Sequence, residues 1–385
     1  MQEISSIVST SAPLLAAGRR MRRTPYTARV EAAGCRVFSI YNHMLLPEVF
    51  RGDVADYHHL KTHVQVWDVG CERQVEIQGR DAATLVQRMT CRDVSRAVPG
   101  QCLYVPLVDE HGGMVNDPVM LKFSDEHFWL SIADSDVLLW AKGLAAGLGL
   151  DVECREPAVW PLAVQGPKAE TLVARLFGEE VRQIRFFRFA TLAWQGHRLT
   201  VARSGWSKQG GFEIYVNDWA LGERLWDACF EAGRDLEVGP GAPHNTERIE
   251  GGLLSYGNDF DNGNNPFEIG LEKYVHLDRD IDFVGRRALA AIRERGITRR
   301  IMGVFLEATE LPACEQGWLV FEEERRVGEV TSASVSPAFG EGIGYAMLDR
   351  SHWNEGTALD VLVPNEGRVR ARVTPLPFIA PRAGS

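Results

Sequence analysis

The residues whose types could do chemistry gather in four polar clusters along the chain. The first cluster spans residues 112–119 and places Asn116 and Asp117 before Pro118. Proline removes a strand hydrogen bond, so this segment is predicted to be a strand edge or to face a site. Asp117 could simply accept hydrogen bonds from turn amides. Alternatively, a carboxylate fixed at a strand end can orient an amine and stabilise the positive charge that develops on it.

The second cluster, residues 203–215, combines a glycine-rich turn with a strand that holds a single acid, Glu213. Strand alternation puts Glu213 on the face opposite Phe212 and Ile214. If those two apolar residues face the core, Glu213 is exposed. If Glu213 faces a cavity, its two oxygens can bind a flat, amidine-like N–H edge. The spacing alone leaves both interpretations open.

The third cluster begins with Arg248 and Glu250 and continues to Asp259. Arg248 and Glu250 could form a structural ion pair. The fourth cluster, residues 329–345, would by itself indicate a turn in a barrel.

Other common sites are not indicated. The chain has no phosphate loop, no Gly-x-Gly-x-x-Gly fingerprint and no Gly-x-Ser-x-Gly nucleophile turn. His59 and His63 have helical ligand spacing, but no glutamate follows His59, so a solvated helix face is expected and no metal. The seven cysteines are scattered without a Cys-x-x-Cys pair, which is typical of a reducing cytoplasm.

Composition indicates a soluble, cytoplasmic protein with small-molecule partners. The net charge of -10 disfavours nucleic acid and anionic membrane surfaces. No apolar run approaches the ~20 residues that span a bilayer. Residues 12–18 precede a basic cluster, which is the wrong order for a signal peptide. We therefore expect residues 1–33 to form an N-terminal arm.

A strand, turn and helix unit occurs twice. Residues 73–77 alternate as a strand, Gly79 ends it, and Asp81 can cap a helix with apolar positions at 82, 85, 86 and 89. The same pattern recurs 87 positions later, where residues 164–166 match residues 77–79. The repeat predicts two related α/β subdomains.

Further strands and helices are predicted from the hydrophobic pattern and from the positions of glycine. Two strands are predicted within residues 114–133, joined at residues 124–126, and another at 212–216 before a helix over 219–232. A helix is predicted over 286–295 and a boundary near Gly296. Short strands punctuated by glycine then predict a small β-barrel, at 301–306, 318–321, 327–331, 358–363 and 368–373.

Taken in order, the four clusters resemble the glycine cleavage T-protein superfamily from about Ile40 to Phe378. The matching motifs are Asp68-Val69 with residues 75–82, the Gly-Phe-Glu turn at 211–213, and residues 248–259. Within the superfamily, residues 41–47, 116–119, 203–209, 265–266 and 270–274 resemble the dimethylsulfoniopropionate (DMSP) demethylase branch. The chain departs from the aminomethyltransferases at Asn116 and at residues 206–209.

The resemblance implies an α+β fold, a three-domain cloverleaf around a central folate channel. Residues 34–295 would form two intertwined α/β subdomains that bind folate, and residues 296–385 a C-terminal β-barrel. Tetrahydrofolate would be the cofactor, with Asp117 as the catalytic residue near its N5 atom and Glu213 gripping the pterin. The other implied folate-binding residues are Tyr104, Trp206, Ser207, Tyr215 and Arg248. A homodimer is left open.

The implied reaction moves the S-methyl group of DMSP to N5 of tetrahydrofolate. A sulfonium methyl group is already activated, because the neutral sulfide leaves without a proton. Catalysis then reduces to alignment of the two reactants. One alternative is a folate-dependent methyl- or aminomethyltransferase that uses another N-, O- or S-methyl donor. A second is a non-catalytic, folate-binding regulatory protein.

Overall fold

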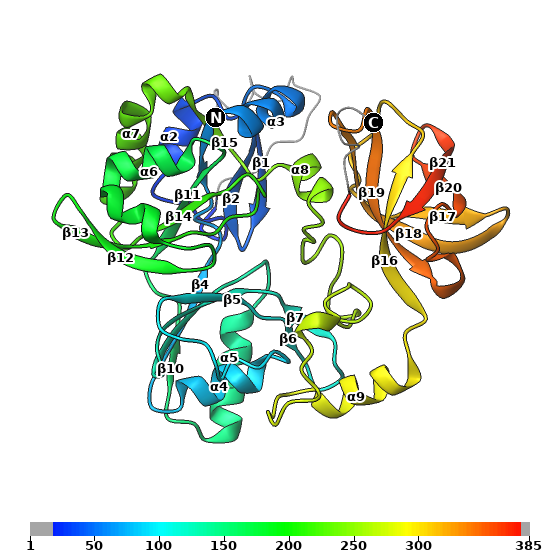
Figure 1. Cartoon of the computed structure of the whole chain (residues 1–385), viewed down its shortest axis with the longest axis horizontal. Coiled ribbons are helices and arrows are strands. Elements are labelled where there is room, and N and C mark those ends of the chain that lie inside the picture. The colour runs from blue at the N-terminus through cyan, green and yellow to red at the C-terminus, as the bar shows by residue number, and fades with distance from the viewer. Residues whose placement is uncertain (1–17, 379–385) are drawn as a thin grey trace, which may run out of the picture.

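The computed structural model describes residues 18–378. Two sheet-and-helix lobes and a barrel lobe stand at the corners of a triangle (Figure 1). The predicted α+β fold with a C-terminal β-barrel is confirmed. The predictions for residues 1–17, including the apolar stretch at 12–17, lie outside the described residues.

The first lobe is a six-stranded sheet covered on one face by helices. Its strand order is β12-β13-β14-β11-β3-β15, and only the β15–β3 pair is parallel. The helices α2, α6 and α7 share one apolar core with this face of the sheet. The strands are β3 (Val64–Asp68), β11 (Trp160–Gln165), β12 (Phe189–Trp194), β13 (His197–Ala202), β14 (Gly211–Val216) and β15 (Val238–Gly241). The helices are α2 (Thr27–Ala32), α3 (Asp53–Thr62), α6 (Ala169–Phe177) and α7 (Leu221–Ala232).

The second lobe is a five-stranded antiparallel sheet in the order β10-β4-β9-β8-β5. Helices α4 and α5 pack with one face of it in a second core. The elements are β4 (Gln74–Gln78), α4 (Ala82–Met89), β5 (Gln101–Tyr104), β8 (Val119–Ser124), β9 (His127–Ser131), α5 (Val137–Leu148) and β10 (Glu153–Arg155). The strand pair predicted within residues 114–133 is β8 and β9.

The two copies of the repeated unit lie in different sheets, since β4–α4 belongs to the second lobe and β11–α6 to the first. Both turns use a glycine with positive φ, 139° at Gly79 and 119° at Gly166. The prediction that Asp81 caps α4 is wrong in one respect. Asp81 stands at the N-cap, but its carboxylate accepts a hydrogen bond from the amide of Asp151 (2.9 Å), which ties the turn to the chain before β10.

The third lobe is a closed barrel in the order β16-β19-β18-β17-β20-β21. Its strands are β16 (Arg299–Leu306), β17 (Trp318–Glu322), β18 (Arg325–Ser336), β19 (Glu341–Asp349), β20 (Ala358–Val363) and β21 (Gly367–Thr374). The barrel turn expected within residues 329–345 is the connection from β18 to β19 at residues 337–340, whereas residues 342–345 belong to β19. Gly344 is needed there since a Cβ atom would stand 2.7 Å from the carbonyl oxygen of Ser332 on β18.

Shorter elements connect the lobes. They are the hairpin β1 (Val37–Tyr41) and β2 (Met44–Val49), the pair β6 (Leu107–Val108) and β7 (Met114–Asn116), α8 (Asn245–Glu250), α9 (Arg286–Arg295), and the 3-10 turns Glu179–Gln183, Arg234–Leu236, Glu272–Tyr274 and Arg350–His352. A core that includes Met114, Ile249, Leu289 and Tyr345 joins α8 and α9 to the second and third lobes. Within residues 18–378, no helix has the length and apolar character needed to cross a membrane.

Candidate functional site

A cavity of ≈ 1880 Å³ is lined by residues of all three lobes. Six of the seven residues that the sequence predicted for the site border it, and Tyr215 lies directly behind Glu213. The six are Tyr104, Asp117, Trp206, Ser207, Glu213 and Arg248. Segments more than a hundred residues apart in the sequence therefore meet around one space.

Asn116 fixes the turn that carries Asp117. Its amide group donates to the carbonyl of Ala133 (3.0 Å) and the hydroxyl of Ser135 (2.8 Å), and its Oδ1 accepts from the amides of Asp117 and Ala133, both at 3.0 Å. Asn116 thus ties this turn to the segment that follows β9. The Asp117 carboxylate is left to face the cavity, where the hydroxyl of Tyr104 donates to its Oδ2 (2.7 Å).

The environment of Asp117 disfavours its charge. Burial raises its pKa to about 7, because the cavity wall replaces water around the carboxylate; the Tyr104 hydrogen bond opposes this rise. Burial also raises the pKa of Tyr104, as does the Asp117 charge. The Asp117 carboxyl can therefore exchange a proton near neutral pH.

Glu213 is buried on the strand face that turns away from the helices. Phe212 and Ile214 lie in the core with α6 and α7, whereas the opposite face of β14 meets the second sheet in a separate cluster. Of the two interpretations of Glu213, the exposed one is wrong, since only 8% of the residue is exposed and it borders the cavity. The hydroxyls of Ser204 and Tyr215 both donate to its Oε2, which leaves Oε1 available to a ligand. Burial raises the pKa of Glu213.

Gln165 shapes the glycine-rich turn that presents Trp206. Its Nε2 donates to the carbonyl of Ser204 (3.2 Å), and its Oε1 accepts from the hydroxyl of Ser207 (2.7 Å). The turn runs so close to this side chain that a Cβ atom on Gly205 would lie 2.2 Å from it. Ser207 thus holds the turn in place, and Trp206 is left at the cavity.

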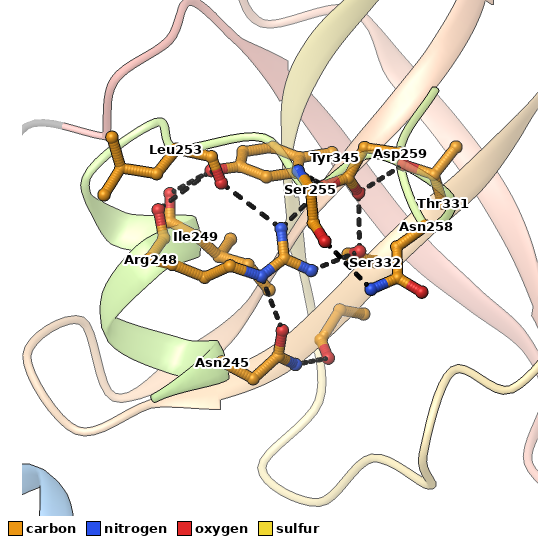
Figure 2. A network of polar contacts seen from close by, with 11 residues as sticks. Asn245, Arg248, Ile249, Leu253, Ser255, Asn258, Asp259, Thr331, Ser332 and Tyr345 are labelled. Carbon is orange, nitrogen blue, oxygen red and sulfur yellow. Dashed lines mark hydrogen bonds and ion pairs between the residues drawn. The ribbon is translucent and has the colours of Figure 1, made fainter. Parts of the chain in front are cut away.

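Arg248 is committed to a network that joins α8 to the barrel (Figure 2). Its guanidinium donates to Asp259 (2.6 Å), to the Ser332 hydroxyl (2.7 Å) and to Asn245 (2.9 Å). The Arg248 and Asp259 side chains are 4% and 0% exposed. The guanidinium also lies 5.6 Å from the centre of the Trp206 ring. Arg248 therefore positions the aromatic wall of the cavity.

The suggested ion pair between Arg248 and Glu250 is wrong. Glu250 pairs instead with Lys61 (2.6 Å) and accepts hydrogen bonds from Tyr57 and Ser336. Residues two apart on a helix do not face each other, so the two side chains of α8 reach different neighbours.

The histidines His59 and His63 are half-buried rather than solvated. Their ring centres are 5.0 Å apart, and His59 Nε2 bonds the carbonyl of Glu237 (2.9 Å). In the described part of the chain, no three His, Cys, Asp or Glu side chains gather as a metal site.

Sequence reasoning missed Glu72, which lies in the turn between β3 and β4 and borders the cavity. Burial and the nearby charge of Glu213 raise the pKa of Glu72 well above its usual value. The only available signal was its place between the motif Asp68-Val69 and the motif at residues 75–82.

Two family models match the chain. The model described as the GCVT N-terminal domain matches residues 26–279, and the glycine cleavage T-protein C-terminal barrel domain matches residues 299–379. Together they cover both sheet lobes and the barrel.

Relatives and one solved structure agree with these matches. The chain is 53% identical over 347 residues to the dimethylsulfoniopropionate demethylase DmdA of Ruegeria pomeroyi, which covers 90% of this chain and 94% of the relative. It is 29% identical to an aminomethyltransferase of Desulfitobacterium hafniense, over 93% of this chain and 98% of the relative. The crystal structure of the glycine cleavage system aminomethyltransferase T from Bartonella henselae matches with a TM-score of 0.84 and 20% identity, covering 94% of this chain and 98% of that one.

Proposed function

The chain belongs to the glycine cleavage T-protein family, and from this we propose that it is a tetrahydrofolate-dependent DMSP demethylase. The reaction moves an S-methyl group to N5 of tetrahydrofolate and gives 3-(methylthio)propanoate and 5-methyltetrahydrofolate. The observation that carries this proposal is the similarity, over nearly the whole chain, to the Ruegeria pomeroyi demethylase.

The residues around the cavity fit a folate. Tetrahydrofolate supplies a nucleophilic amine, N5, as the methyl acceptor. Glu213 is suited to the pterin because two hydroxyls fix its carboxyl group and one oxygen stays free for the N–H edge. Tyr104 and Trp206 offer aromatic surface in the same cavity. The volume of the cavity leaves room for a second, smaller substrate.

Asp117 is the catalytic residue of this proposal. Its carboxylate compensates the positive charge that develops on the folate amine as the methyl group arrives, and then holds the proton that the amine releases. A pKa of about 7 suits both tasks, since the group is ionised in part of the population and can still accept a proton. Tyr104 orients the carboxylate through its hydrogen bond.

Three predicted folate-binding residues act through their neighbours in this proposal. Tyr215 and Ser207 are each 1% exposed, so they hold Glu213 and the Trp206 turn in place. Arg248 backs Trp206 from the barrel side. We call these positioning residues, since each of them holds a neighbouring part of the site through a hydrogen bond or a packing contact.

The expected partners are small molecules, which the net charge of -10 supports over nucleic acid. A cytoplasmic location, a homodimer and the domain limits 1–33, 34–295 and 296–385 stay predictions from the sequence.

The test is methyl transfer itself. The purified protein receives tetrahydrofolate with DMSP, or with dimethylglycine, and loss of a methyl group from each donor is measured. Dimethylglycine represents the alternative of an N-methyl donor, and its amine leaving group needs an acid or prior activation. Turnover of DMSP alone supports the proposal, whereas turnover of dimethylglycine alone contradicts it.

A further inference from the structure

We propose that Glu72 and Tyr41 form the subsite that holds the cationic end of the methyl donor, with the Glu72 carboxylate as its counter-charge. This inference rests on the proposed function and assigns residues to its second substrate. The two residues come from different elements and border the same cavity.

The hairpin of β1 and β2 brings Tyr41 to Glu72. Its tip uses two residues with positive φ, 50° at Asn42 and 63° at His43, which is the backbone of a tight two-residue hairpin turn. The Asn42 side chain donates to the carbonyls of Cys71 (3.1 Å) and Ile132 (3.4 Å). The hairpin is therefore pinned to the residue that directly precedes Glu72.

Glu72 itself is fixed but unpaired. Its amide donates to the carbonyl of Val69 (2.9 Å), which closes the turn after β3. Its carboxylate makes no hydrogen bond or ion pair with another side chain in residues 18–378, whereas the adjacent Arg73 is directed to Glu156. The nearest cation in the sequence is thus committed elsewhere.

Two arginines of the cavity wall also pair with other carboxylates. Arg248 pairs with Asp259 (2.6 Å), and Arg203 pairs with Glu170 (2.6 Å). The carboxyl group whose charge acts on Glu72 is Glu213, and the hydroxyls of Ser204 and Tyr215 donate to its Oε2. An uncompensated carboxylate in such a place takes up a proton or a cation.

The second substrate supplies that cation and the folate does not. The ionised groups of a folate are its carboxylates, whereas the sulfonium of DMSP carries a positive charge. A weakly hydrated sulfonium can lie against the ring of Tyr41, because an aromatic face attracts cations. Burial raises the pKa of the Tyr41 phenol, and the nearby charges of Glu72 and Asp117 add to this rise.

The two carboxylates, Glu72 and Asp117, match the places where positive charge lies before and after methyl transfer. The S–CH3 bond breaks and sulfur keeps the electron pair, while the N5–CH3 bond forms and the amine gives up its proton. Positive charge therefore leaves the side of Glu72 and appears on the side of Asp117. The Glu72 charge does not attract the uncharged sulfide of the product. The subsite therefore favours substrate over product.

The test compares charge selectivity in the full-length protein. Binding is measured by calorimetry for the wild type, Glu72→Gln and Tyr41→Leu. The ligands are DMSP and 4-methylpentanoate, its isostere in which an uncharged carbon replaces the sulfonium and the carboxylate is kept. A counter-charge a few ångströms away predicts that Glu72→Gln weakens DMSP binding by roughly 10- to 100-fold. Binding of 4-methylpentanoate and tetrahydrofolate should stay unchanged. Glu315→Gln, the same substitution at an exposed position elsewhere on the cavity wall, should leave all three ligands unaffected.

Two outcomes overturn the inference: DMSP binding by Glu72→Gln equal to that of the wild type, or equal loss for both DMSP and its isostere. If Tyr41→Leu does not fold, the isosteric Glu72→Gln variant decides alone. Tetramethylammonium separates this inference from the proposed function. If tetramethylammonium binds in a way that depends on Glu72 but no methyl group is transferred from DMSP, the result supports the cation subsite and rejects the demethylase. If the wild type binds neither DMSP nor tetramethylammonium more tightly than 4-methylpentanoate, the subsite is rejected.

Discussion

At the scale of single residues, Asn116 and Tyr104 together decide what Asp117 can do. Asn116 accepts a hydrogen bond from the amide of Asp117 and ties this turn to Ala133, which follows β9. Tyr104 fixes its direction with one hydrogen bond and leaves the remaining lone pairs open to the cavity. Burial then brings the pKa of Asp117 to about 7. A carboxyl group in this position is prepared for a partner that becomes positively charged.

The pH dependence of methyl transfer should report this carboxyl group. Because its pKa is raised to about 7, the group is protonated below that pH and ionised above it. If the ionised form compensates charge on the folate amine, kcat rises with pH through about 7. Asp117→Asn should lower kcat by roughly 10²- to 10³-fold and remove this inflection. Steady-state rates across pH check both, with tetrahydrofolate binding as the control for folding. An inflection that persists in Asp117→Asn would assign the titration to another group.

The sequence could identify these residues more easily than their orientation. Alternation along β14 puts Glu213 opposite Phe212 and Ile214, but the pattern is the same whether the other face meets water or a second sheet. Only the contact between the two sheets decides this. Arg248 shows the same difficulty, because its partner, Asp259, lies beyond the helix and is brought to it by the fold.

At the scale of elements, the duplicated strand–helix unit depends on a glycine that lets another chain segment pass closely. A Cβ atom on Gly166 would lie 2.5 Å from the carbonyl oxygen of His63, and one on Gly79 would lie 2.4 Å from that of Asp151. Both glycines also have the positive φ that side chains disfavour. The repeated Gln-Gly pair in the sequence thus marks a real constraint.

Replacing this glycine should destabilise the protein. Gly166→Ala combines backbone strain with a steric clash and should cost more than about 2 kcal/mol of unfolding free energy. The matched variant is Gly143→Ala in α5, where the added carbon would have no atom within 4 Å apart from its chain neighbours and the backbone of its own helix. It should stabilise by roughly 0.5–1 kcal/mol, since alanine favours a helix interior over glycine. Thermal unfolding of both variants checks this, and equal shifts would contradict the role of Gly166.

The junction of α8 and the barrel depends on the buried pair of Arg248 and Asp259 (Figure 2). Arg248→Met leaves the buried carboxylate of Asp259 without its counter-charge, so we expect a loss of about 3–5 kcal/mol. Asp259→Asn in the same chain should recover part of this loss. Unfolding of the two single variants and the double variant measures the coupling. Strictly additive effects would show that the two residues act independently.

The barrel strands were only partly predictable from local pattern. Strand β18 extends beyond the predicted residues 327–331, and β19 was not predicted at all. The glycines at positions 342 and 344 are typical of turns when taken alone. In the barrel they allow β19 to pack closely against its neighbours, which is a property of the closed sheet and not of the segment.

At the scale of the whole molecule, the cavity needs all three lobes. The first sheet supplies Glu213, the second supplies Tyr104, and the α8–barrel junction backs Trp206. The resemblance to a known family predicted this arrangement, whereas composition and periodicity gave only the elements. The convergence of distant segments is set by long-range packing, which no short pattern contains.

The most direct test of the central claim follows the methyl group. The protein is mixed anaerobically with tetrahydrofolate and with DMSP whose S-methyl groups are fully deuterated, and the folate product is analysed by mass spectrometry. Direct transfer predicts 5-methyltetrahydrofolate that keeps all the deuterium of one methyl group, formed in equal amount with 3-(methylthio)propanoate. A folate product at the methylene level, or no labelled folate at all, would contradict the account.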